Sequence, residues 1–255
     1  VHYLVQENLA FVQDNGLISI TNMGALLFAK NFSEFPTVAR KAARVIQYGG
    51  DGRLVMSRQR TFPQGYVLCL DDIVGHVLDL LPATTVIERA TRHEVTQLPE
   101  IAIREAVANA LIHQDFGITG AGPLIEVFSN RVEITNPGVP LVDTMRILND
   151  PPRSRNEQMA ALLRRLDLCE EAGSGWDKMV AACELRQLPA PRIETAGNNT
   201  RVVLFADIPF KNLTPDERRM GCYWHACVKY ANADAATNKS LRERFGLSDS
   251  QSAQV

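Results

Sequence analysis

Residues 98–116, LPEIAIREAVANALIHQDF, have the pattern of one long helix with two different faces. Pro99 suits the first turn of a helix, and Glu100 suits the positive end of the helix dipole. The apolar residues that would pack into a core are Ile101, Val107, Ala108 and Leu111. The stretch therefore predicts a buried helix, and its polar face is the first place to look for chemistry.

A polar stripe runs along this predicted helix. Glu105, Asn109 and His113 are spaced by four residues, and four residues turn about 400°, so all three side chains project from one face. An amide oxygen is a hard ligand for hydrated Mg²⁺, and a carboxylate can act as a base towards an attacking water. The pattern indicates a metal-assisted site, and the alternative is a solvated helix face that holds one i,i+4 hydrogen bond.

Two glycine-containing turns follow the polar stripe. Asn136-Pro137-Gly138 ends a predicted strand with a sharp turn, and Gly173-Ser174-Gly175 opens a predicted helix. A helix start presents free N–H groups and a positive dipole end, which favour phosphate. Each turn alone is commonly just a turn, but the order of polar helix, strand turn and glycine loop indicates a nucleotide pocket.

The remaining elements alternate between helices and strands. Apolar residues at spacings of three and four predict helices over 2–14, 21–32, 65–82, 156–171 and 173–188. Alternating or β-branched runs predict strands over 17–21, 38–48, 53–62, 84–99, 123–130 and 131–138, and two more within 191–210. This mixture predicts an α/β (α+β) protein.

The character of the chain changes after residue 213. Thr214 and Pro215 predict a capped helix, and residues 236–255 suggest a helix-turn-helix with Gly246 at the turn and a second helix starting at Ser248. Its basic residues, which we expect to contact DNA phosphates, are Lys239, Arg242 and Arg244. The alternative is a small helical dimerisation or linker element.

The composition fits a folded protein and excludes several other classes. The chain has 255 residues, 45% of them hydrophobic, and a net charge of −2, which allows one large core or two modest ones. No apolar run reaches the roughly 18 residues of a spanning helix, so we expect no membrane association, and no charged leader indicates a signal peptide. The balanced charge excludes a broad polycationic surface but allows a small DNA-binding face.

Several side chains are expected to be structural. The five cysteines are odd in number and lack CxxC spacing, which predicts reduced thiols in a cytoplasmic protein and no zinc ribbon. We expect Asp71-Asp72 on the exposed side of a helix, His225 packed in a core, and Arg164-Arg165 on a solvated helix face.

The order of these motifs resembles the GHKL ATPase superfamily of histidine kinases, gyrase, MutL and heat-shock chaperones, whose N-box is similar to residues 104–115. Residues 98–116, 131–140 and 154–179 more narrowly resemble ATP-binding transcriptional regulators described as RecG-helicase-related. In that family this domain follows a Schlafen AlbA-like domain and precedes a winged helix. The resemblance covers nearly the whole chain, because residues 21–30 are similar to the usual connector and the C-terminal part to the start of the winged helix.

The resemblance implies a GHKL (Bergerat-type) two-layer α/β sandwich followed by a partial winged-helix segment. Residues 1–35 would be a helical connector, 36–209 the ATP-binding domain and 210–255 the start of the winged helix. Glu105 would be the general base, Asn109 the Mg²⁺ ligand, and His113 a support on the phosphate side.

Further residues receive roles from the same resemblance. Asn136 to Gly138 would lie under the adenine, Gly173 to Gly175 would face the phosphates of ATP, and Arg155 and Asn156 would line the same cleft. The wider superfamily has Asp where Asn136 stands; an amide oxygen can accept the adenine hydrogen bond but without a charge. Close relatives commonly have Arg where Gln114 stands, so one cation is absent here.

Three functional hypotheses remain open at this point. The first is a cytoplasmic transcriptional regulator that binds ATP and contacts DNA through flanking modules. The second is an ATPase, weak or helicase-related, that couples hydrolysis to nucleic-acid remodelling. The third is a degenerate ATPase scaffold retained for homo-oligomer formation. The expected partners are a nucleotide and DNA, and under the third hypothesis a second copy of the chain.

Overall fold

The computed structural model describes residues 1–88, 91–147, 153–169 and 175–247, with only the backbone described between 83 and 95. A six-stranded mixed sheet forms its centre, in the order β4-β3-β7-β8-β10-β9. The strands are β3 (Ala43–Tyr48), β4 (Met56–Phe62), β7 (Leu124–Val127), β8 (Arg131–Pro137), β9 (Arg192–Ala196) and β10 (Asn199–Phe205). The β3–β7 pair is parallel and the other neighbouring pairs are antiparallel.

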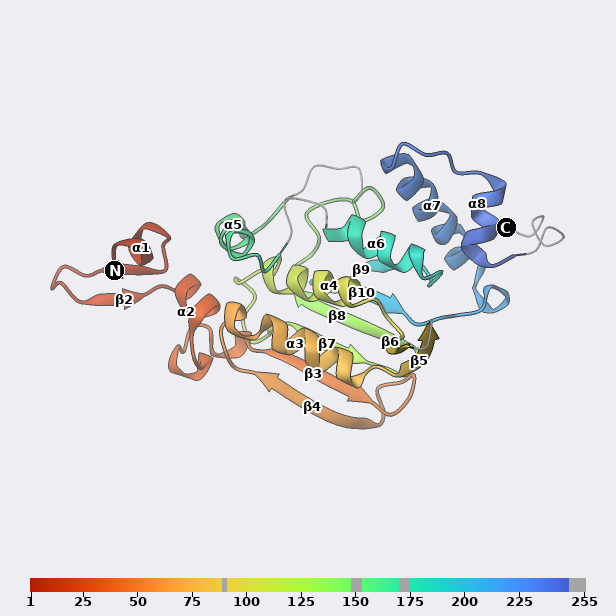
Figure 1. The fold of residues 1–255 in the computed structure, drawn as a ribbon. Coiled ribbons are helices and arrows are strands. Elements are labelled where there is room, and N and C mark those ends of the chain that lie inside the picture. Colours follow the sequence, from red (N-terminus) through yellow and green to blue (C-terminus); the bar gives the residue numbers. More distant parts are fainter. Residues whose placement is uncertain (89–90, 148–152, 170–174, 248–255) are drawn as a thin grey trace.

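Three helices cover one face of this sheet (Figure 1). They are α3 (Tyr66–Leu80), α4 (Glu100–Ile112) and α6 (Gly175–Leu185). A parallel strand pair needs a long crossover connection, and α3 and α4 lie within the connection between β3 and β7. The prediction of a two-layer α/β sandwich is therefore confirmed.

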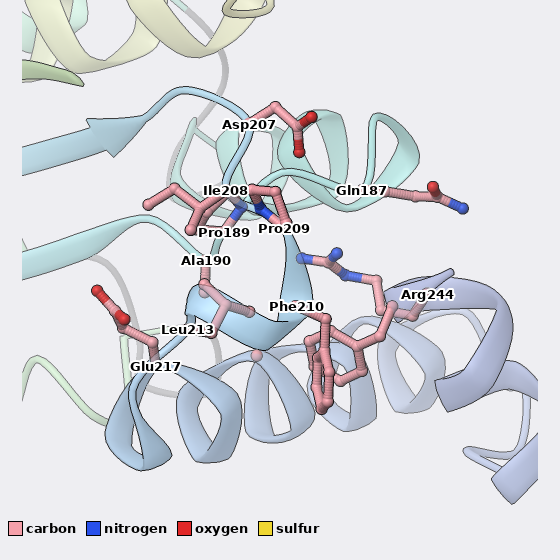
Figure 2. A pocket seen from close by; sticks show the side chains of 12 residues that line it. Gln187, Pro189, Ala190, Asp207, Ile208, Pro209, Phe210, Leu213, Glu217 and Arg244 are labelled. Atoms are coloured by element: carbon pink, nitrogen blue, oxygen red, sulfur yellow. The ribbon is translucent and has the colours of Figure 1, made fainter. Parts of the chain in front are cut away.

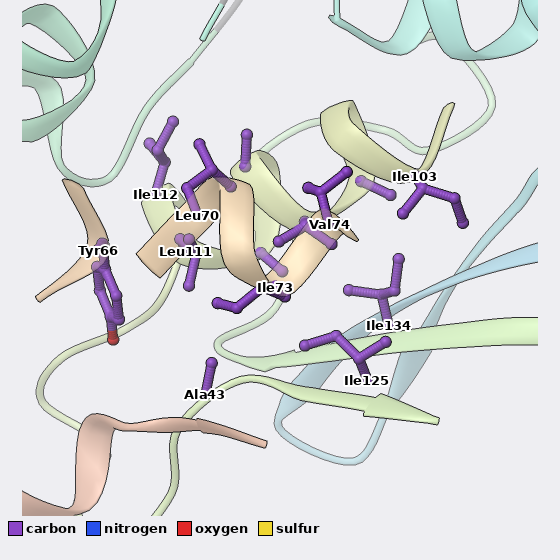
Figure 3. Packing of buried hydrophobic residues seen from close by; sticks show 14 of the residues in the cluster. Ala43, Tyr66, Leu70, Ile73, Val74, Ile103, Leu111, Ile112, Ile125 and Ile134 are labelled. Carbon is purple, nitrogen blue, oxygen red and sulfur yellow. The ribbon is translucent and has the colours of Figure 1, made fainter. Parts of the chain in front are cut away.

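The core lies between these two layers (Figure 3). Figure 3 shows Ile73 of α3 and Ile103 of α4 packed above Ile125 of β7 and Ile134 of β8, and all four side chains are buried. Ile125 and Ile134 face each other in the register of the β7–β8 pair. This packing fixes α4 against the sheet, and so it also fixes the direction of the polar stripe.

The opposite sheet face carries a charged network. Glu126 and Glu133 are directly paired across β7 and β8, and both are buried. Like charges in this position repel, but Arg53 lies 2.7 Å from Glu126 and 2.5 Å from Glu133, and Arg131 lies 2.7 Å from Glu133. The pair is thereby neutralised, and the loop that carries Arg53 is tied to the sheet.

The N-terminal segment differs from the prediction of one helix over residues 2–14. The structure has α1 (His2–Gln6) followed by a hairpin of β1 (Ala10–Val12) and β2 (Ile18–Ile20). Asn8 stops the helix with a φ of 55°, and Phe11 pairs with Ser19 across the hairpin. Next come α2 (Asn22–Phe28), η1 (Phe32–Glu34) and η2 (Ala39–Lys41).

A second prediction, one strand over residues 84–99, is also wrong. The chain there forms a separate hairpin of β5 (Ala83–Glu88) and β6 (Thr91–Thr96). The alternating pattern continues through both strands, and no glycine, proline or asparagine marks the reversal between Glu88 and Thr91. Periodicity alone therefore could not show where the strand turns back.

The C-terminal helices lie at the opposite end of the molecule from the N-terminal hairpin (Figure 1). After η3 (Phe210–Asn212) come α7 (Pro215–Ala231) and α8 (Asn238–Phe245). Thr214 caps α7 as predicted, in a capping box with Glu217. Gly246 ends α8 with a φ of 62°, but the second helix predicted from Ser248 lies outside the described residues. None of the helices in the described ranges is both long and apolar enough to cross a membrane.

Candidate nucleotide-binding site

A cavity of about 530 Å³ lies beside the polar stripe of α4. Its size is within the usual range for small-molecule sites. The residues singled out from the sequence that line it are Glu105, Asn109, His113, Asn136, Arg155 and Gly175. Folding therefore brings together side chains from α4, β8, α6 and the segment before α5 (Glu157–Arg165).

The polar stripe of α4 faces this cavity and not bulk solvent. Glu105 is only 4% exposed, although an ionisable side chain on a solvated helix face would be largely exposed. From Glu105 to His113 the helix rises about 12 Å, because each residue adds 1.5 Å. The stripe thus has two ends, with Glu105 at one, His113 at the other and Asn109 between them.

Gly175 brings the start of α6 against the Glu105 end. A Cβ on this residue would lie 2.5 Å from Glu105 Oε2 and 3.5 Å from Asn109 Nδ2. Only glycine avoids that overlap, so the first turn of α6 can pack directly on the polar stripe. Its N-terminal N–H groups and dipole give this end of the cavity a positive potential. Gly173 and Ser174 lie outside the described residues.

Asn136 forms the other end of the cavity and is buried. Its Nδ2 lies 3.4 Å from the His113 carbonyl and 3.2 Å from the Pro137 carbonyl. Two carbonyl oxygens can only accept, so the amide must present its nitrogen to them. No donor in the described part of the chain is paired with Oδ1, which leaves an acceptor at a cavity wall.

Gly138 supports this end without lining the cavity. Its φ of 105° is one that L side chains rarely adopt, and a Cβ would overlap Arg155 Nη1. Thr200 on β10 donates to its carbonyl at 2.7 Å. The turn after β8 therefore packs closely against Arg155. The Nη2 of Arg155 donates to the Val139 carbonyl at 3.2 Å.

Asn156 and Gln114 form hydrogen bonds within the protein around the end of α4. Asn156 Nδ2 donates to the carbonyls of Ile112 at 2.7 Å and Gln114 at 2.8 Å, where it satisfies the C-terminal end of α4. Asn156 is not among the cavity-lining residues. Gln114 is fully buried and donates to the Tyr66 hydroxyl at 2.9 Å. Both residues therefore hold α4 in place rather than face a ligand.

His113 lies at the Asn136 end, close to Arg155. Burial, followed by the positive charge of Arg155, lowers the pKa of His113 below its ordinary value. Both effects favour the neutral imidazole over the cation. His113 lies about two helical turns from Glu105 and so is remote from Gly175. Its role on the phosphate side stays a prediction.

Trp176 and Arg164 are among the cavity-lining side chains that sequence reasoning missed. Trp176 is buried and packs edge-on against Trp224 of α7, with ring centroids 6.0 Å apart. Arg164 was expected on a solvated face, but it lines the cavity on α5 with Ala160 and Ala161. Spacings of three and four were the available signal, although spacing cannot tell a cavity-facing side from a solvated one.

The basic residues expected at DNA have different surroundings. The Lys239 side chain is 78% exposed, and Arg242 is half-buried. Arg244 is buried instead, pairs with Glu184 of α6 at 2.5 Å, and donates to the Leu188 carbonyl. Figure 2 shows it among the residues around a small cavity of about 100 Å³. Its guanidinium thus ties α8 to α6 and does not face solvent.

His225 belongs to the same junction and is buried as predicted. Its Nδ1 lies 2.5 Å from Glu184 and its Nε2 lies 2.8 Å from Ser240. Elsewhere Asp71 and Asp72 are exposed, also as predicted. No group of three or more His, Cys, Asp or Glu side chains that could hold a metal occurs within the described residues.

Comparison with known proteins supports the type of domain. Residues 120–204 match the model of a family described as "Putative ATP-dependent DNA helicase recG C-terminal". The matched range runs from the segment before β7 to β10, so the chain contains an ATPase-like, RecG-related domain. The helix that carries Glu105 and Asn109 precedes the matched range. No curated protein matches the sequence.

One solved structure with a similar fold is the crystal structure of the DIP2311 protein from Corynebacterium diphtheriae. The TM-score is 0.65 at 20% sequence identity, over 95% of this chain and 50% of that chain. At this identity the likeness shows the fold alone. The present chain spans half the length of that protein.

Proposed function

We propose that this chain binds a purine nucleotide, ATP with Mg²⁺, as the sensing domain of a cytoplasmic transcriptional regulator. The observation that carries the proposal is the cavity between an uncharged acceptor, Asn136 Oδ1, and the Glu105 end, where α6 begins. The adenine amino group would donate to Asn136. The phosphates would extend along the polar stripe towards Gly175 and its helix N-terminus.

The residues at the Glu105 end fit a bound Mg²⁺. This ion prefers oxygen ligands, keeps several waters, and is commonly held by one or two protein groups plus phosphates. The Asn109 side-chain oxygen would supply the protein ligand, and the bound ion would neutralise phosphate charge. The five free cysteines favour a reducing compartment, the cytoplasm.

Isothermal titration calorimetry with ATP and a non-hydrolysable analogue, with and without Mg²⁺, tests this proposal. We expect micromolar binding that requires Mg²⁺ and is weakened by Asn109→Ala. Asn212→Ala is the matched control, because Asn212 is exposed and distant from the cavity lining. No binding at millimolar nucleotide would refute the nucleotide-sensing role.

Hydrolysis is a second candidate function, supported by the buried position of Glu105 at the cavity. A carboxylate there can accept a proton from an attacking water. Glu105→Ala should abolish phosphate release while leaving the affinity for the analogue nearly unchanged. Equal turnover in the wild type and the variant would exclude Glu105 as the base and leave binding as the function.

DNA association is the third part of the proposal. It is supported by the RecG-related match and by the exposed Lys239. We expect this protein to shift DNA in a gel, and the shift should be weaker at higher salt because phosphate contacts release counterions. Lys239→Ala should reduce the shift. Absence of any shift at low salt would contradict DNA binding.

A further inference from the structure

Arg164 lies where two openings meet. It lines the cavity of about 530 Å³ described above and a second, wider opening of about 820 Å³. Glu105, Ala161 and Cys169 also line both spaces. The guanidinium therefore belongs to the Glu105 end of the polar stripe, where the cavity opens outward.

The direction of α5 explains this position. Asn156, the N-cap of α5, donates to the Ile112 carbonyl at the C-terminal end of α4. Arg164, in the last turn of α5, lines the wider opening together with Ile101 and Arg104 from the first turns of α4. The two helices thus run in opposite directions along the cavity, and α5 delivers Arg164 to the end that is remote from Asn136.

Among the described residues, the charge of Arg164 has no partner. No ion pair or hydrogen bond joins its half-buried guanidinium to any residue in the part of the chain that the structure describes. The other arginines at this opening are engaged, since Arg165 binds Glu7 at 2.8 Å and Arg104 binds Asp71 at 2.7 Å. A planar guanidinium in a partly desolvated position is well suited to a phosphate group.

The length of the polar stripe on α4 indicates how long a ligand must be to reach Arg164. A nucleotide with its base at Asn136 has about 12 Å of helix to follow before it reaches Glu105. The group that arrives beside Arg164 is then the last one in the phosphate chain. A diphosphate is one group shorter and would leave the guanidinium without a partner.

We propose that Arg164 binds the terminal phosphate of a nucleoside triphosphate and makes the site prefer triphosphates over diphosphates. This inference rests on the proposed nucleotide-binding function. It assigns Arg164 a direct contact with the ligand, and it distinguishes Arg164 from its neighbour Arg165, whose charge is already paired with Glu7.

The test compares ADP with the β,γ-imido analogue of ATP, both with Mg²⁺, by isothermal titration calorimetry. Arg164→Ala should weaken binding of the analogue about tenfold or more, the loss expected for one charge-assisted hydrogen bond, and change ADP affinity less than about twofold. Arg165→Ala is the matched control and should change neither affinity. Arg164→Lys keeps the charge without the planar fork and should restore part of the preference.

The outcomes separate the inference from the function on which it rests. If the wild type binds neither nucleotide, the proposed function fails and the role of Arg164 falls with it. If the wild type binds both, and Arg164→Ala weakens them equally or not at all, the function stands and the terminal-phosphate role is overturned. If Arg164→Ala does not fold, Arg164→Gln, which keeps the length of much of the side chain without its charge, decides: an unchanged triphosphate preference in that variant overturns the role.

Discussion

Replacing Gly175 by alanine would test how closely the first turn of α6 packs on α4. A Cβ at this position lies 2.5 Å from Glu105 Oε2, and real Cβ atoms essentially never approach a heavy atom within 3.0 Å. Glu105 is buried against α6, so its carboxylate can move aside only towards the open spaces that it lines. The substitution must therefore displace the carboxylate into the cavity or push α6 away from α4.

Two opposing effects determine how Gly175→Ala changes the free energy of unfolding. Alanine is better than glycine inside a helix by about 0.5–1 kcal/mol, whereas an added methyl group in packed space costs about 1–3 kcal/mol. We expect the second effect to dominate, so Gly175→Ala should lower the free energy of unfolding by about 1 kcal/mol. Gly75 on α3 is the control, because a Cβ there meets no heavy atom of the described residues within 4 Å. Gly75→Ala should raise the free energy of unfolding by about 0.5–1 kcal/mol.

Urea unfolding followed by tryptophan emission measures both variants. A double-mutant cycle with Glu105→Ala isolates the contact, since removing the carboxylate removes the overlap. In that background Gly175→Ala should become stabilising, as Gly75→Ala is in the wild type. If Gly175→Ala alone stabilises the protein as much as Gly75→Ala does, the close packing of α6 on the polar stripe is refuted.

Three other predictions concern the junction of α8 with α6, the charged network of the sheet, and the cavity. Arg244→Ala should lower the free energy of unfolding by about 3 kcal/mol, because it removes the arginine that pairs with the half-buried Glu184 and leaves that carboxylate with His225 alone; thermal or urea unfolding measures this, and a loss below about 0.5 kcal/mol would contradict it. Burial raises the pKa of Glu133, but the hydrogen bond from one neighbouring arginine and the charges of three outweigh it, so the net pKa lies below 4.5. The ionised Glu133 therefore stabilises the folded protein fully above about pH 4.5, and this stabilisation is lost as the pH falls through the lowered pKa. The urea midpoints of Glu133→Gln should vary less with pH over that window than those of the wild type. Nucleotide binding should change the emission of Trp176, which lines the cavity, so the change should persist in Trp224→Phe and disappear in Trp176→Phe.

The local elements of the fold were predictable because their signals are local. The helix over 98–116, the paired strands over 123–138 and the cap at Thr214 follow from spacing, turn chemistry and capping, and the structure has all three. The parallel pairing of β3 with β7 was not predictable, because it joins segments separated by the α3–α4 crossover. The helix expected over 2–14 failed because apolar residues that fit a helical spacing also fit a short hairpin.

The candidate site was predictable only in part, because spacing along the chain shows local structure but not which distant segments meet. Spacing placed Glu105, Asn109 and His113 on one face, and that face does line the cavity. Spacing could not show that α5 runs back along α4, so Arg164 was assigned to solvent. Nor could it show that the side-chain amide of Asn156 donates its hydrogen bonds to the carbonyls at the end of α4.

The departure at Asn136 has a local physical cause. The superfamily that the sequence resembles has Asp at the matching position, but here the side-chain Nδ2 lies 3.4 Å from the His113 carbonyl and 3.2 Å from the Pro137 carbonyl. A carboxylate would place a negative oxygen against two acceptors, in a buried position where an unpaired charge is costly. An amide satisfies both carbonyls with its nitrogen and turns its oxygen towards the cavity. Under the proposed function, the adenine would therefore meet an uncharged acceptor, and the base would be held less strongly than by a carboxylate. A larger share of the affinity would then have to come from the phosphate end, where Asn109, the start of α6 and Arg164 lie.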